Sequence, residues 1–203
     1  MGKSLYFLAL GFTEDAALFT SKAIRRATGG PSHVVVLVRE ISPDGRQESY
    51  YFESIAKADA VTHKSGVRGP IPLSRLSEWV DEKPSRSLLT VPDKGYLPLA
   101  QEEAADAVRR LRDAVPTIHY AHTQLGQNLL ARIGVRFSLG GGSDKAWTCC
   151  ETPLRAGVLP PRWWGEVGMA DVNADEFWPG GSSRYSLMAA VQRVIAAHGT
   201  VDV

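Results

Sequence analysis

The chain has 203 residues, of which 44% are hydrophobic and 22% are charged, and its formal net charge is +1. This length and composition are typical of one globular domain, which we expect to span residues 1–203 and to bury a full core without disulfides. The balanced charge and the absence of any block of like charges argue against a nucleic-acid partner.

No run in the sequence approaches the roughly 20 apolar residues that a membrane span needs. The apolar run near the N-terminus is short and lacks a small-residue cleavage site, so it is not read as a signal peptide. With only two cysteines, which are adjacent, the default expectation is a cytoplasmic protein without an integral membrane segment.

In chain order, residues 1–12 predict a first strand, and residues 13–30 predict a helix that Thr13 caps and a glycine pair ends. The β-branched segment 32–40 and the segment 48–55 flank a Pro-Asp-Gly turn, which predicts a β-hairpin. Later patterns predict strands at 61–73 and 85–92 and helices at 74–80, 99–115, 121–134 and 184–198. Helices that alternate with clustered strands indicate the α+β class.

The segment DKAWTCCETPLR places the only two cysteines side by side, at positions 149 and 150. Adjacent cysteines are poorly placed for a disulfide with each other. Pro153 is tolerated only in the first turn of a helix, so a helix through this segment must begin close to Cys149. The positive end of a helix favours a thiolate, which makes Cys149 the candidate nucleophile, half-exposed, while Cys150 is turned by about 100° into the packing.

A thiol nucleophile needs a general base and a group that orients the base. Of the five histidines, His33 stands out because it begins an apolar strand. If the hairpin turn is centred near Pro43, His33 pairs with Glu53 across the two strands, and a carboxylate beside an imidazole is the arrangement that a cysteine enzyme uses. The alternatives are a histidine satisfied within the strand and a glutamate that is an exposed charge or an ion-pair partner.

The ordered segments GGPSHVVVLV, YYFESI and AWTCCETPLR resemble the circularly permuted papain-like cysteine hydrolases of the NlpC type, YiiX-like members included. The resemblance implies helices packed on a small antiparallel sheet and amide hydrolysis or acyl transfer without a cofactor. It assigns the nucleophile to Cys149, the base to His33 and the orienting carboxylate to Glu53, with backbone N–H groups at the start of the cysteine helix as the oxyanion hole. The doubled cysteine departs from the family pattern.

The expected substrate is a peptide-like or acyl compound, and the expected reaction is cleavage of a peptide or isopeptide bond. The alternatives are a lipid-directed acyltransferase or thioesterase with the same triad, and a non-catalytic binding module. The segment HYAHTQLG resembles the tyrosine-containing stretch before the cysteine helix in relatives and implies Tyr120 near the site. Trp163 and Trp164 are candidates for lining a substrate groove, with the edge of the core or a membrane surface as the other interpretations.

Two other kinds of site fit the sequence poorly. Adjacent thiolates chelate one ion badly, and structural zinc ligands are usually two to four residues apart, so no metal is expected. The glycine-rich segment SLGGGSDK lacks both the Lys-Ser/Thr ending and the preceding strand of a phosphate-binding loop. The non-catalytic alternative to a reactive thiol is that both cysteines are simply buried in the core.

Overall fold

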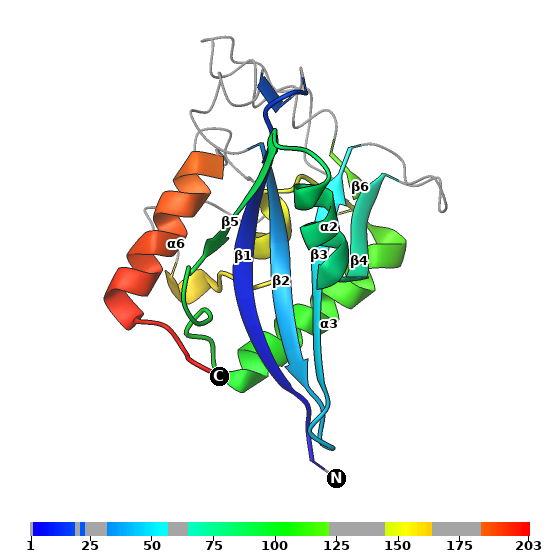
Figure 1. The fold of residues 1–203 in the computed structure, drawn as a ribbon. Coiled ribbons are helices and arrows are strands. Elements are labelled where there is room, and N and C mark those ends of the chain that lie inside the picture. The colour runs from blue at the N-terminus through cyan, green and yellow to red at the C-terminus, as the bar shows by residue number, and fades with distance from the viewer. Residues whose placement is uncertain (1, 19–20, 23–31, 57–64, 122–144, 164–183) are drawn as a thin grey trace.

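The structure is a computed structural model that describes residues 2–18, 21–22, 32–56, 65–121, 145–163 and 184–203. These residues form an antiparallel five-stranded sheet with the strand order β4-β3-β2-β1-β5, together with four α-helices (Figure 1). The predicted α+β class is therefore confirmed.

The strands of this sheet are β1 (Leu5–Asp15), β2 (His33–Ile41), β3 (Gln47–Ile55), β4 (Gly66–Pro72) and β5 (Arg86–Val91). The helices are α2 (Leu73–Asp81), α3 (Gln101–Thr117), α5 (Glu151–Arg155) and α6 (Arg184–His198), with a 3-10 turn η1 (Pro161–Trp163). Two short strands, β6 (His119–Tyr120) and β7 (Ala146–Trp147), pair in parallel. The predicted hairpin, the strands near 61–73 and 85–92, and the helices near 74–80, 99–115 and 184–198 are all present, whereas the helix predicted at 121–134 lies almost wholly outside the described residues.

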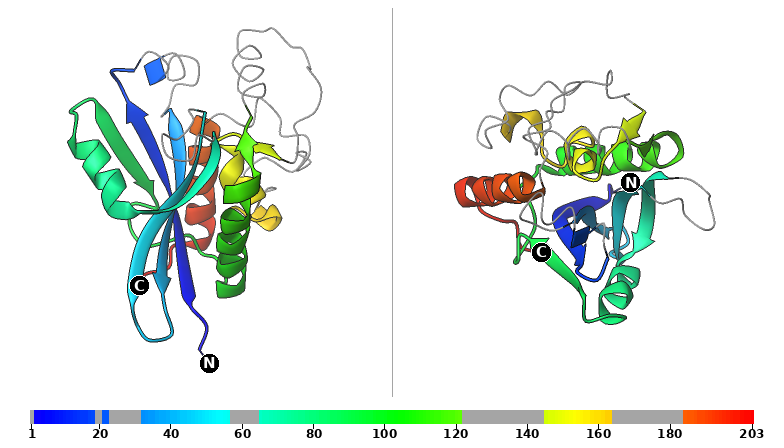
Figure 2. Two further views of the ribbon diagram at one scale, coloured as in Figure 1. Left: turned by 90° about the vertical axis from the view of Figure 1, so that its right-hand side faces the viewer. Right: turned by 90° about the horizontal axis from the view of Figure 1, so that it is seen from above.

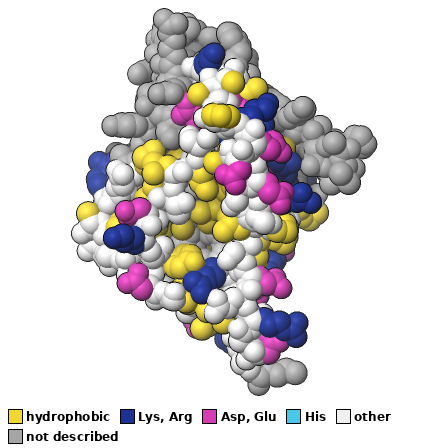
Figure 3. Space-filling view, viewed as in Figure 1, with side chains coloured by type: hydrophobic (Ala, Val, Ile, Leu, Met, Phe, Trp, Pro, Cys, Tyr) yellow, Lys and Arg dark blue, Asp and Glu magenta, His cyan; other side chains and the backbone are white. Residues whose placement is uncertain are grey.

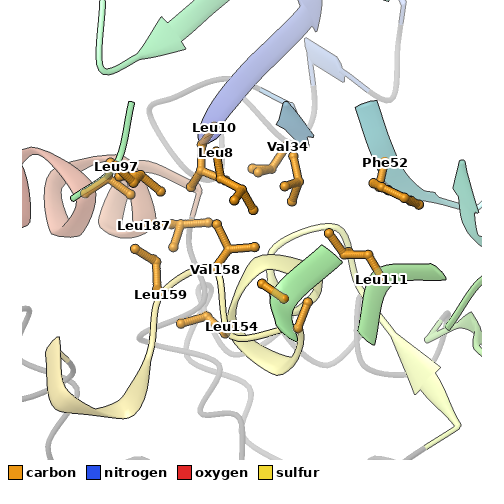
Figure 4. Close-up of a cluster of buried hydrophobic side chains, with 14 of the residues drawn as sticks. Leu8, Leu10, Val34, Phe52, Leu97, Leu111, Leu154, Val158, Leu159 and Leu187 are labelled. Carbon is orange, nitrogen blue, oxygen red and sulfur yellow. The ribbon is translucent and has the colours of Figure 1, made fainter. Parts of the chain in front are cut away.

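The main core lies between one face of the sheet and the helices α3, α5 and α6 (Figure 2). Leu10, Val34 and Phe52 from three neighbouring strands meet Leu111 of α3 and Leu154 of α5 (Figure 4). All five side chains are at most 4% exposed. Each such burial stabilises the fold by about 1.5–3 kcal/mol, so this layer fixes where the strands and α5 stand relative to one another.

The opposite face of the sheet is partly covered by α2 (Figure 2). Because side chains alternate along a strand, Val35 and Leu37 of β2 point to this face and pack with Tyr51 of β3 and Leu76 of α2. Hydrophobic side chains also gather at the surface over the middle of this face, with charged side chains around them (Figure 3). The odd-numbered residues of the hairpin, His33 and Glu53 included, thus belong to the α2 face.

The prediction of a helix starting at Thr13 is wrong. Strand β1 continues through Thr13 to Asp15, because these residues pair with Leu88 and Arg86 of β5. The Asp15 carboxylate also accepts hydrogen bonds from Ser85 Oγ and Arg86 Nε, at 2.8 and 3.1 Å. These partners lie some 70 residues further along the chain, so the local pattern could not reveal them. Residues 19–20 and 23–30 of the predicted helix lie outside the described part of the chain.

The predicted hairpin is confirmed, but its register differs from the predicted one. Val35 faces Glu53 and Ile41 faces Gln47, which centres the turn on Asp44 rather than Pro43. The Ser42 N–H donates to the Arg46 carbonyl, and Gly45 takes a positive φ of 83° that favours glycine. The centre moves by a whole residue, so every side chain keeps its predicted face.

Candidate active site

The first turn of the cysteine helix begins at Thr148, ahead of the five residues of α5. The Glu151 side chain accepts a hydrogen bond from the Thr148 N–H at 2.6 Å, and the Glu151 N–H donates to Thr148 Oγ1 at 3.3 Å. This reciprocal pair is a capping box, and the sequence TCCE carries its Thr-x-x-Glu signature. It places Cys149 and Cys150 in the first helical turn, next to the parallel pair of β6 and β7.

His33 and Glu53 form a direct hydrogen bond, in which His33 Nε2 lies 2.7 Å from Glu53 Oε2. An ionised carboxylate only accepts, so the imidazole N–H is the donor. Since Val35 is the residue opposite Glu53, His33 lies one diagonal step along the same face, a separation that two long side chains can bridge. The predicted contact is therefore present although the predicted register was wrong.

Cys149 is the second group that acts on His33, through hydrogen bonding and charge. Burial by itself lowers the pKa of His33, but the hydrogen bonds and charges of Cys149 and Glu53 outweigh it and raise that pKa to about 9. Because Glu53 occupies Nε2, Nδ1 is the ring nitrogen left to take the thiol proton. The structure thus joins a thiol, an imidazole and a carboxylate in one chain of contacts.

Arg68 of β4 is a further partner of Glu53, and it was not predicted from the sequence. Its Nε and Nη2 atoms donate to Glu53 Oε1 at 2.8 and 2.5 Å. Burial acts to raise the pKa of Glu53, but His33 and Arg68 outweigh it, so the pKa is lowered and the group stays ionised. Arg68 and Glu53 face each other across β3 and β4. This pairing could not be predicted, because the register between these two strands is irregular.

A pocket of about 570 Å³ opens on the α2 face beside this cluster. His33, Glu53 and Arg68 line it, together with Arg75 and Trp79 of α2. The His33 side chain keeps 22% of its surface exposed, against 8% for Glu53. The imidazole and the Arg68 guanidinium therefore both reach solvent, since the Arg68 side chain is 36% exposed.

Cys149 differs from the prediction of a half-exposed sulfur. It is 1% exposed and Cys150 is 5% exposed, and both belong to the main core. The cause is the packing of α5 against the sheet, with Leu154 one turn further along the helix. Neither sulfur forms a disulfide. Burial alone therefore does not separate the two sulfurs, whereas the contact with His33 does.

The three aromatic candidates have different positions. Trp163 is 2% exposed, packs in the main core and stacks against His198 with ring centroids 6.0 Å apart, which favours its interpretation as a core residue over a groove-lining one. Trp164 lies outside the described residues. Tyr120 is 7% exposed, and its pairing with Trp147 sets its backbone beside the strand that leads into Cys149. Its role in substrate binding stays a prediction.

Within the described ranges, no group of three His, Cys, Asp or Glu side chains is placed to hold a metal ion. No helix in that part of the chain is both long enough and apolar enough to cross a membrane.

Comparisons of the chain with protein families, with curated proteins and with solved structures find no match.

Proposed function

We propose that this chain is a thiol hydrolase that cleaves an amide bond, of the peptide or isopeptide kind, through Cys149, His33 and Glu53. The observation that supports the proposal most is the continuous contact from the Cys149 thiol to the His33 imidazole and on to the Glu53 carboxylate. Nucleophile, base and orienting group in mutual hydrogen-bond reach are the arrangement that cysteine hydrolysis requires.

In the proposed reaction, His33 already carries the proton near neutral pH because its pKa is raised to about 9, and the Cys149 sulfur attacks the carbonyl carbon as a thiolate. The carbon–nitrogen bond breaks, and the imidazolium returns its proton to the leaving amine. A water molecule then attacks the thioester, gives its proton to the same imidazole and releases the acid, which restores the thiol. Glu53 holds the ring by Nε2 and compensates its positive charge, and backbone N–H groups beside Cys149 are the candidate donors to the oxyanion.

The proposal includes the family. The order of the proposed triad along the chain, with histidine first, glutamate second and cysteine last, is that of the permuted papain-like hydrolases of the NlpC type. The antiparallel sheet with a cysteine helix packed on it is compatible with that architecture. The fold class alone does not carry the function, so the proposal rests on the three side chains.

The first test is alkylation of the native protein by iodoacetamide as a function of pH, with the labelled sulfur located by peptide fragmentation. We expect labelling of Cys149 well below the ordinary thiol pKa of about 8.5, because the imidazolium favours the thiolate. The matched control is His33→Ala, in which labelling should require higher pH. A thiol that reacts only after unfolding would contradict the enzyme and support a non-catalytic module.

The second test identifies the reaction. Native protein is incubated with cell extract, quenched in acid and searched by mass spectrometry for an acyl group on Cys149. A peptide-derived acyl group that disappears in water supports the hydrolase. A fatty acyl group that moves to an added alcohol or amine would instead support a lipid-directed acyltransferase with the same triad.

A further inference from the structure

The Glu53 carboxylate is divided between two partners. Oε2 accepts from His33 Nε2, whereas Oε1 accepts from Nε and Nη2 of Arg68. We infer that Arg68 is a positioning residue, which holds Glu53 in the orientation that places its second oxygen on His33. This inference rests on the proposed function, because the orientation of His33 matters to activity only if His33 is the base.

The local backbone is built for this contact. The ladder between β3 and β4 is irregular between Tyr51 and Glu53, directly before Glu53 meets Arg68. Gly69 follows with a φ of +139°, and a Cβ atom there would lie 2.5 Å from the Phe52 ring and 2.8 Å from the Tyr51 carbonyl oxygen. A larger residue would push β4 away from β3, so glycine allows the close approach that brings the guanidinium onto the carboxylate.

A buried carboxylate with one partner could rotate about its side-chain torsions or accept a proton. Two guanidinium donors that converge on Oε1, with His33 on Oε2, restrict that rotation and keep the group charged. Among the described residues, the ionisable groups that act on His33 are Cys149 and Glu53, and those that act on Glu53 are His33 and Arg68, with Tyr51 beside both Glu53 and Arg68. Glu14, Asp15 and Arg75 line the same pocket. Arg68 is thus placed to act on His33 through Glu53.

The direction of a pKa change separates positioning from a simple charge effect. If Arg68 were only a nearby cation, its removal would relieve repulsion and raise the pKa of His33. If Arg68 holds Glu53 in place, its removal lets the carboxylate leave Nε2, and the pKa of His33 falls. The two outcomes have opposite signs, and neither requires catalytic activity to be measured.

The experiment is an NMR titration of the His33 ring in full-length Arg68→Ala, compared with its parent. Both carry Cys149→Ser, so that the thiol does not titrate with the imidazole. We expect the pKa of His33 to fall by about one pH unit or more in Arg68→Ala. In Arg68→Lys, which cannot supply the two guanidinium donors, the pKa of His33 should lie between the values of the parent and of Arg68→Ala. An unchanged or raised pKa in folded Arg68→Ala would overturn the inference. Should Arg68→Ala not fold, Arg68→Lys decides it alone, and an unchanged value there would overturn the inference.

The matched control is Arg75→Ala. Arg75 lines the same pocket but pairs with Glu78 at 3.0 Å, so its loss should leave the His33 titration unchanged.

Because the pocket reaches Arg68, guanidinium chloride below denaturing concentration should restore the pKa of His33 in Arg68→Ala and do nothing in Arg75→Ala. No restoration would count against a specific guanidinium–carboxylate contact. An unreactive Cys149 in the natural sequence would refute the proposed function while leaving this titration interpretable.

Discussion

Two glutamates on the central hairpin have similar surroundings and different consequences. Glu40 of β2 is 13% exposed in its side chain and accepts hydrogen bonds from Tyr6, Tyr50 and Arg112, at 3.1, 2.8 and 3.0 Å. Burial acts to raise its pKa, but the two tyrosines and the arginine outweigh it and lower that pKa. Burial raises the pKa of Tyr50, and, against the effect of burial, the charges of Tyr50 and Glu40 help to raise the pKa of Arg112, so neither partner changes charge near neutral pH. Glu40 therefore has a structural role, because it links the sheet to Arg112 of α3.

Glu53 of β3 is also buried, ionised and paired with an arginine, but its other partner is His33. That imidazole titrates in an accessible pH range, contacts Cys149 and borders a pocket. The comparison shows that a buried carboxylate with an arginine does not mark a site. The proposed site differs in having a titratable partner that acts together with the proposed nucleophile and borders a pocket.

The largest effect that would test this distinction is the loss of the proposed nucleophile. Cys149→Ser should reduce turnover by at least about 10³-fold, because a serine hydroxyl is a far weaker nucleophile at neutral pH. Steady-state rates on the substrate found by acyl trapping measure it. Since Cys149 is buried, thermal unfolding of the same variant must show that it is folded. Activity close to that of the natural sequence would remove Cys149 from the mechanism.

The second prediction compares the two glutamates directly. Glu53→Gln should lower the rate by tenfold or more, because a neutral amide cannot compensate an imidazolium, and an amide oxygen turned toward His33 puts its NH₂ group against the Arg68 donors. Glu40→Gln should leave the rate unchanged and lower the free energy of unfolding by about 1–3 kcal/mol. Equal losses of rate in both variants would show that the assumed difference between the two clusters is wrong.

The third prediction concerns the pH dependence of stability. The pKa of His33 is about 9 in the folded chain and roughly 6.5 in an unfolded one. A raised folded-state pKa stabilises the fold fully below the unfolded value, and this contribution is lost as the pH rises through about 9. The difference in unfolding free energy between the natural sequence and His33→Gln, measured by urea titration across about pH 6 to 10, should therefore shrink with rising pH. A constant difference would mean that the pKa of His33 is not raised in the folded chain.

The fold was predictable where the signals were local. The β-branched strand, the Pro-Asp-Gly turn and the long amphipathic helix each carry their own pattern, and the hairpin and α3 follow from them. The continuation of β1 to Asp15 was not predictable, because the competing helix signal at Thr13 is local and the winning pairing with β5 is distant.

The candidate site shows the same division. The alternation of strand residues was enough to bring His33 and Glu53 to one face, and that inference survived a register error because the turn centre moved by a whole residue. Arg68 was missed because its place depends on a register shift between β3 and β4. The burial of Cys149 was missed because it depends on how α5 packs, although the Thr-x-x-Glu capping box that starts this helix was readable in the sequence.

The smallest predicted effect separates the two sulfurs, which share burial but not partners. Cys150→Ser should keep most of the activity and lose about 1–2 kcal/mol of unfolding free energy, because it puts a hydroxyl at a position in the main core that is only 5% exposed. Cys150→Ala is the matched control, since it removes the sulfur without adding a polar group. Urea unfolding should rank the serine variant below the alanine variant if the hydroxyl is unsatisfied. If Cys150→Ser is folded but inactive while Cys149→Ser is active, the nucleophile is Cys150. His33 would then have to act on the Cys150 thiol.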